Sequence, residues 1–237
     1  AHGVERWREN CGCNSGMHPG WIQTWRKPLR EAMDWLRDRL APLFEEKAGK
    51  YLKDPWRARD DYIEVILDRS AENVEGFIER HALKELTREE KKDVLKLMEI
   101  QRNTMLMYTS CGWFFDEISG METTQVMRYS ARAIQLGEEA LGASLEKGYL
   151  QILETAPSNI PEFEHGAKIY ERFVKPALLD FIRVGGHYAI SSLFEEYSKR
   201  TRIYCYWAET EIYDRMEAGK LGLAIGKTRI SSEITWD

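Results

Sequence analysis

The chain has 237 residues, of which 43% are hydrophobic and 31% are charged. This composition is typical of a globular protein and excludes intrinsic disorder. The formal net charge is −5, without the basic balance or stripe that usually marks a nucleic-acid binder. No apolar run approaches the roughly 20 residues that a membrane-spanning helix needs. We therefore expect neither a nucleic acid nor a membrane as a partner.

The compartment and completeness of the chain are inferred from its start and its cysteines. The sequence has no signal or transit peptide and begins at Ala1 without an initiator Met, as if taken from a longer protein. Four cysteines are too few for a disulfide scaffold. We expect them to be reduced in a cytoplasmic protein, with a Cys111–Cys205 disulfide as the alternative.

The first 24 residues are Gly-, Cys- and His-rich and have no sustained periodicity, which indicates a connecting loop over 1–24. A helical bundle is expected over 25–184, because apolar residues then recur at steps of three and four. The first such stripe consists of Trp25, Leu29, Met33, Leu36, Leu40 and Phe44.

Helix start signals divide this bundle into segments. Asp54 before Pro55 predicts an N-cap with a first-turn proline, and Thr87 with Glu90 predicts a capping box. Further helices are expected over about 122–136 and around 145–153, and a last one over about 164–183 that Pro176 should kink.

After Gly185 and Gly186 the apolar period changes to two, which is typical of β-strands. Four alternating segments are expected, starting near Tyr188, Ile203, Leu221 and Thr228. The pattern stops at the last residue, so we expect a partial antiparallel β-domain over 185–237. The predicted fold class is mainly α: a multi-helix bundle followed by the first strands of a truncated antiparallel β-domain.

Two histidines and two cysteines in the first 18 residues form a candidate metal site. His2, Cys11, Cys13 and His18 are spaced H-x8-C-x-C-x4-H, and thiolates with imidazoles are ligands that zinc prefers. The spacing is not that of a zinc finger, so a Gly-rich loop with buried thiols and no cofactor is the alternative. A third interpretation is a loop that lines a ligand cleft, since tryptophans flank it.

In the run from Tyr108 to Glu117, three aromatic side chains and two acids follow directly after Gly112. Aromatic faces pack against sugar rings and carboxylates accept sugar hydroxyls; alternatively, the aromatics cap the core and the acids are solvated. Asp116 and Glu117 are adjacent, so they do not form a glycosidase acid–nucleophile pair, which needs roughly 5–9 Å with a sugar between its members. The sequence has no P-loop, dinucleotide fingerprint or nucleophile elbow.

Two long runs resemble an uncharacterised branch of family 57 glycoside hydrolases. One is AHGVERWRENCGC (1–13) followed by WRKPLR (25–30), and the other is MYTSCGWFFDEI (107–118). The resemblance extends over essentially the whole chain, in the region that follows the catalytic barrel.

The resemblance implies a function in α-glucan hydrolysis, branching or transfer. In this family the catalytic carboxylates lie on an N-terminal barrel, and a helical bundle packs on that barrel and closes one side of the cleft. A Ser-x-Asp-Trp-Phe signature in the bundle reaches substrate; here Gly112 stands where its Asp would be. The residues that the resemblance and the composition suggest as substrate contacts are Trp113, Phe114, Asp116, Trp7 and Trp25.

We therefore expect a cleft-completing region without catalytic residues of its own, with the upstream barrel and an α-glucan or oligosaccharide as partners. One alternative is a structural or oligomerisation module that does not touch sugar. Another is a metal-stabilised interaction domain.

Overall fold

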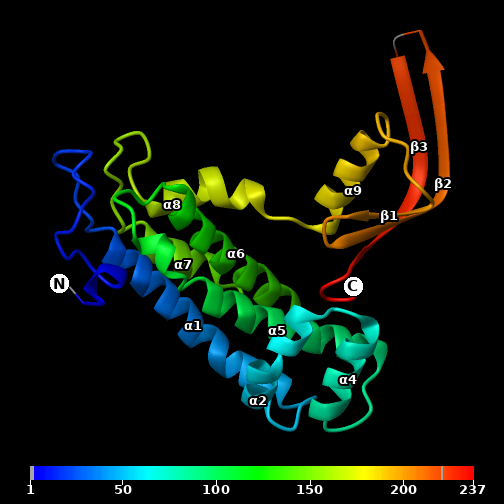
Figure 1. The fold of residues 1–237 in the computed structure, drawn as a ribbon, viewed down its shortest axis with the longest axis horizontal. Coiled ribbons are helices and arrows are strands. Elements are labelled where there is room, and N and C mark those ends of the chain that lie inside the picture. The colour runs from blue at the N-terminus through cyan, green and yellow to red at the C-terminus, as the bar shows by residue number, and fades with distance from the viewer. Residues whose placement is uncertain (1–2, 220) are drawn as a thin grey trace. The chain divides into compact units, whose positions relative to one another are not determined.

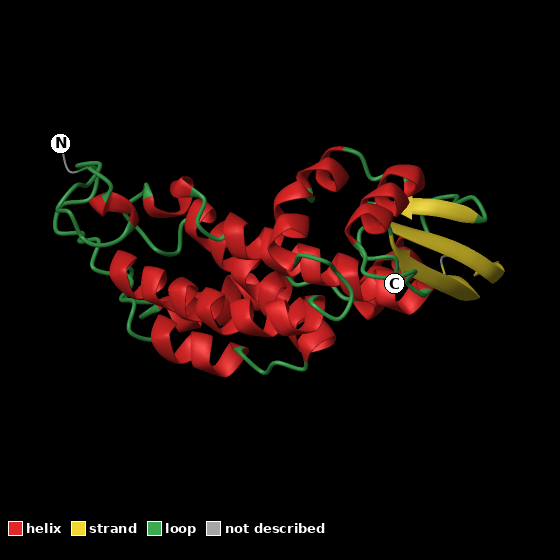
Figure 2. Cartoon of the chain, turned by 90° about the horizontal axis from the view of Figure 1, so that it is seen from below, coloured by secondary structure: helices red, strands yellow, loops and turns green. Residues whose placement is uncertain are grey.

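The computed structural model describes residues 3–219 and 221–237, and it divides into two compact units. The first unit comprises the chain up to Leu178 apart from residues 69–71, and the second comprises 69–71 with 179–237. The named strands all belong to the second unit (Figure 2). The predicted fold class is confirmed, since a helical bundle precedes an antiparallel sheet.

The first unit is a bundle in which α5 packs on α6 and α1 packs on α6 and α7 (Figure 1). Its elements are η1 (Glu5–Trp7), α1 (Arg26–Ala48), α2 (Pro55–Asp61), α3 (Ile63–Leu67), α4 (Ala71–His81), α5 (Arg88–Leu106), η2 (Ser110–Trp113), α6 (Met121–Leu141), α7 (Glu146–Leu153), α8 (Gly166–Ile169), the π-helical η3 (Tyr170–Val174) and η4 (Lys175–Ala177).

Local sequence signals explain where these helices begin. The predicted stripe on α1 is fully buried, and Asp54 accepts a hydrogen bond from the backbone N–H of Arg57 at 3.0 Å, as expected of an N-cap. The capping box is also confirmed, because Thr87 and Glu90 each accept a hydrogen bond from the other's backbone N–H.

The second unit contains α9 (Phe181–Ser191) and a sheet in the order β1-β2-β3. Strands β1 (Arg200–Ile203), β2 (Tyr206–Ala218) and β3 (Leu221–Ser232) pair antiparallel. Gly219 has a φ of +65° in the hairpin turn. The register shifts between Thr210 and Ile212, where a side chain on Gly226 would meet the Ile212 carbonyl oxygen at 2.6 Å.

The segment that begins near Tyr188 was expected to be a strand, and this prediction is wrong. It belongs to α9, which Asp180 caps by accepting from the backbone N–H of Arg183 at 2.7 Å. Only Val184 and Tyr188, four residues apart, are buried on this helix. Of the alternating residues Tyr188, Ile190 and Ser192, only the first and the last are buried, and these two are four residues apart, as on one face of a helix.

Two other boundaries differ from the prediction. The helix around Pro176 does not kink and continue; it ends in the 3₁₀ turn η4, and Leu178 is extended. The third and fourth expected strands are one strand, β3. No described helix is both long and apolar enough to pass through a bilayer.

Candidate functional site

Three segments that are distant in sequence meet at one end of the bundle (Figure 1). They are the N-terminal segment 3–24, the turn 110–118 that contains η2, and the loop 157–160 before α8. Trp7 donates its indole N–H to the Ser110 carbonyl oxygen at 3.0 Å. Ile22 and Asn159 exchange two hydrogen bonds of 3.0 and 2.9 Å. We call this region the bundle end.

Two of the suggested substrate contacts are buried in the bundle end. Trp113 is 1% exposed and Trp25 is 0% exposed. Trp113 donates its indole N–H to the Arg26 carbonyl oxygen at 3.4 Å, and Trp25 donates to the Asp116 carbonyl oxygen at 3.3 Å. Neither ring has a face available to a ligand, so both pack the core, which is the alternative that the sequence left open.

Gly112, which replaces the acidic residue of the resembled signature, is enclosed by α6. A Cβ atom there would meet the two methyl carbons of Val126 at 2.6 and 2.8 Å. Its carbonyl oxygen accepts from the Thr123 hydroxyl at 2.7 Å. An Asp side chain cannot fit at this position without displacing Val126, so the polar function of the signature is absent here.

The carboxylate of Asp116 is buried and holds the N-terminal segment. One oxygen accepts both the backbone N–H and the hydroxyl of Ser15, and the other faces the Gln23 amide nitrogen at 3.5 Å. Both oxygens of the Asp116 carboxylate thus face donors within the protein, which makes it a structural group and not a displayed sugar acceptor. The solvated-acid alternative is wrong for this residue as well.

Glu117 has the same structural role toward the loop 157–160. It is buried, and it accepts the Ser158 hydroxyl at 2.6 Å, the Asn159 backbone N–H at 2.8 Å and the Ser119 backbone N–H at 3.2 Å. The two adjacent acids therefore point to different segments. Together they fix the turn 110–118 between the N-terminal segment and the loop.

The aromatic surface that the bundle end exposes consists of Phe114 and Phe115. Their side chains are 52% and 46% exposed, and their rings lie edge to face with centroids 5.3 Å apart. The Arg6 guanidinium carbon lies 5.0 Å from the Phe114 ring centre, a cation–π geometry. We call these three residues the Phe114 face. Trp7 is half-buried beside η2.

Arg26 is a buried cation behind this face. It donates to the Phe115 carbonyl oxygen at 3.2 Å and to the Cys11 sulfur at 3.7 Å, and its Nε is buried without a hydrogen-bond partner. Burial lowers its pKa, partly offset by the charges of Cys11 and Asp116.

The Cys11 thiol has a pKa below its usual value of 9.0. Burial acts to raise this pKa, but hydrogen bonds from Cys13 and the positive charge of Arg26 together outweigh it. None of the four cysteines is joined in a disulfide, so the Cys111–Cys205 alternative is wrong.

The candidate zinc ligands are only partly described. His2 lies outside the described residues, and His18 stacks on Trp21 with ring centres 3.9 Å apart. Within the described residues no three His, Cys, Asp or Glu side chains are grouped as metal ligands would be. The zinc site remains a prediction.

Sequence reasoning did not single out Arg6 or Phe115, nor the residues that bind the two acids. Phe115 lies in the run from Tyr108 to Glu117, and its position directly before two acids was the available signal. Ser15 and Asn159 gave no signal, because hydrogen bonds across 101 and 42 residues leave no local pattern.

A family model described as a domain of unknown function, DUF3536, matches residues 21–237. The chain belongs to this family. The match covers the whole bundle and the sheet and begins within the N-terminal segment. Comparisons with curated proteins and with solved structures gave no match.

Proposed function

We propose that this DUF3536 chain is the non-catalytic helical region of a family-57-like enzyme that acts on α-glucans, and that the Phe114 face contacts the glucan. The observation that carries this proposal is the pair of half-exposed phenyl rings on a turn that the buried side chains of Trp113, Asp116 and Glu117 fix by hydrogen bonds. The resemblance of residues 1–13, 25–30 and 107–118 to family 57 supports the choice of substrate.

The chemistry of the Phe114 face is suited to a sugar. Aromatic rings offer an electron-rich face, and the axial C–H groups of a glucose ring pack against such a face. Arg6 lies beside the rings and carries five N–H donors, which sugar hydroxyls accept. Binding to a prearranged surface costs less entropy than ordering a mobile one, and the buried bonds of Asp116 and Glu117 supply that order.

The bundle end itself does not provide acid–base catalysis. Asp116 and Glu117 are adjacent and their oxygens are occupied by Ser15, Ser158 and Asn159. Glycoside cleavage needs two carboxyl groups on either side of the scissile bond. In the proposed function these groups come from the catalytic barrel, which is the expected protein partner.

A second candidate function has its own support. The burial of Trp113, Trp25 and Asp116 favours a module that shapes its neighbour and does not touch sugar. In that case the Phe114 face would be covered by protein. The two functions differ in whether the isolated chain retains affinity for glucan.

Affinity electrophoresis separates them. The chain is run in native gels with and without amylose, beside a Phe114→Ala, Phe115→Ala double variant. We expect amylose to retard the wild type and to retard the double variant at least threefold less. Tyr204→Ala is the control, because Tyr204 is an exposed aromatic outside the bundle end. Equal retardation of all three, or none, would contradict the proposal.

A gel containing hydroxyethylcellulose tests the linkage. The proposal expects retardation by amylose and little by the β-linked polymer. Equal retardation by both would remove the assignment to α-glucans, because the rings would then be a general apolar surface.

A further inference from the structure

We infer a second, separate saccharide-binding site in the C-terminal unit, in the cavity between the end of α9 and β2. This cavity has a volume of about 440 Å³, within the roughly 300–1,000 Å³ of small-molecule sites. A smaller cavity of about 220 Å³ adjoins it, and both are lined by Tyr188, Ser192 and Tyr213. Every lining residue lies in the second unit.

Three tyrosines form the walls, and hydrogen bonds fix each of them. Tyr188 is buried, with its hydroxyl 2.6 Å from the Thr210 hydroxyl. Tyr197 stacks on Tyr188 with ring centres 5.2 Å apart and donates to the Ser191 hydroxyl oxygen at 2.9 Å. The cavity is thus formed before any ligand binds.

Tyr213 is the wall that faces a ligand. Its hydroxyl donates to the Ser192 carbonyl oxygen at 2.7 Å, which fixes the ring across the junction of the two cavities. The side chain nevertheless remains 42% exposed. A ring that is held at its tip and partly exposed at a cavity wall can pack against the apolar face of a sugar.

Three of the four charged side chains that line the cavity make no ion pair in the described part of the chain. Glu195, Glu196 and Lys199 line the cavity, and none of the three makes an ion pair with another residue in the described part of the chain. By contrast, Glu211 on β2 pairs with Lys227 and with Arg229. The rim charges are therefore free to bond a ligand.

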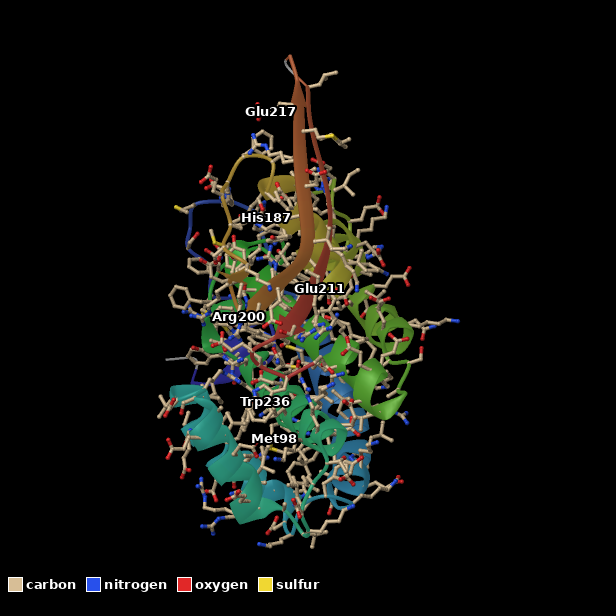
Figure 3. All side chains as sticks on the ribbon, turned by 90° about the vertical axis from the view of Figure 1, so that its right-hand side faces the viewer. Met98, His187, Arg200, Glu211, Glu217 and Trp236 are labelled. Atoms are coloured by element: carbon tan, nitrogen blue, oxygen red, sulfur yellow. The ribbon has the colours of Figure 1, made fainter. Side chains whose placement is uncertain are left out.

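The fourth rim charge, Arg215, is held by Glu217 at 2.6 Å. Glu217 lies toward the tip of the β2–β3 hairpin (Figure 3). The lining residues themselves comprise two acids and two bases and so carry no net formal charge, and Glu217 is not among them. The lining therefore does not select for a strongly charged ligand of either sign. Donors and acceptors beside aromatic rings suit a neutral, hydroxyl-rich ligand. A short oligosaccharide meets all of these conditions.

The chemistry of this cavity is independent of the Phe114 face, but the use of an α-glucan as the first probe rests on the proposed function. Maltotetraose, cellotetraose and xylotetraose are therefore titrated separately into the ¹⁵N-labelled full chain. We expect at least one of them to shift the backbone amide signals of residues 192–199 and 210–215.

A double variant, with a matched control, tests whether the charged side chains at the rim bind the saccharide. Glu196 and Lys199 are exposed, so the double variant Glu196→Gln, Lys199→Ala should keep the fold, which its amide spectrum checks. We expect its affinity for the bound saccharide to fall at least tenfold. Glu211→Gln, on β2 of the same unit but outside the cavity, should bind as the wild type does.

Two results would overturn the inference: no saccharide shifts these amides, or the rim variant binds with unchanged affinity. The same spectra separate this site from the proposed function. Phe114→Ala should leave the cavity shifts intact. If the wild type shows the cavity shifts but none at 110–116, only the proposed function is contradicted.

Discussion

Ser15 donates its backbone N–H to one carboxylate oxygen of Asp116 at 2.8 Å, and its hydroxyl donates to the same oxygen. This contact joins two residues that are 101 positions apart. Asp116 is the residue that directly follows the exposed Phe115. Asp116, which the sequence suggested as a ligand contact, instead holds the N-terminal segment against the turn 110–118. The exposed rings next to it are displayed by a turn that is fixed on its inner side.

Replacing Asp116 with Ala should loosen the N-terminal segment. The Ser15 N–H and the Gln23 amide would lose a charged acceptor, which costs about 1.5–3 kcal/mol. Urea unfolding measures this loss, and limited proteolysis should show faster cleavage within residues 3–24. Ser15→Ala keeps the backbone bond and should cost less. Asp214→Ala, an exposed acid, is the control; equal stability of the Asp116 and Asp214 variants would disprove that Asp116 holds this segment.

Gly112→Ala should destabilise the chain through Val126. The added methyl would overlap the Val126 side chain, and overpacking of this kind costs about 1–3 kcal/mol. Val126→Ala in the same chain should relieve the overlap, so the double variant should be more stable than the sum of the single effects by about 1 kcal/mol. Thermal or urea unfolding of the four proteins checks this. Strict additivity would contradict the geometry.

Trp113→Ala should lower the free energy of unfolding much more than Phe114→Ala does, although the two residues are adjacent. Removing the buried indole should cost about 3–5 kcal/mol, whereas removing the half-exposed phenyl ring should cost about 0.5 kcal/mol or less. Urea midpoints measure both values. A large loss for Phe114→Ala would show that this ring is packed in solution and would remove it as a ligand contact.

Glu90 should make stability depend on acid pH. A hydrogen bond from Lys84 and then the backbone N–H of Thr87 lower its pKa from 4.5 to about 2 in the folded chain. Because the folded pKa is the lower one, the carboxylate's contribution is complete above pH 4.5 and is lost as the pH falls toward 2. Glu90→Gln should flatten the decline of the unfolding midpoint over this interval. Glu79→Gln, on the exposed side of α4, should not.

The bundle could be predicted from sequence because its signals are local. The apolar stripe of α1 and the caps at Asp54 and Thr87 each lie within a few residues of what they determine. The segment at Tyr188 shows the limit of such predictions. An alternating pattern only a few residues long fits both the period of a strand and that of a helix. Its helix was decided by Asp180, a cap eight residues upstream.

The candidate site was predictable only as a region. The run from Tyr108 to Glu117 does contain the exposed rings, but which aromatic is buried depends on α6 and on the N-terminal segment. Gly112 shows this most clearly: it was noted as a departure from the signature, and Val126, which explains it, gave no signal of its own. Contacts over such separations have no periodicity to detect.

The most direct test of whether the Phe114 face contacts glucan is amide hydrogen exchange with and without saturating maltoheptaose. We predict slower exchange in residues 110–116 when the saccharide is present, and no change there in the Phe114→Ala, Phe115→Ala variant. Unchanged exchange over 110–116 in the wild type, at a maltoheptaose concentration that abolishes the retardation of the chain by amylose in gels, would contradict the assignment of this face as the glucan contact.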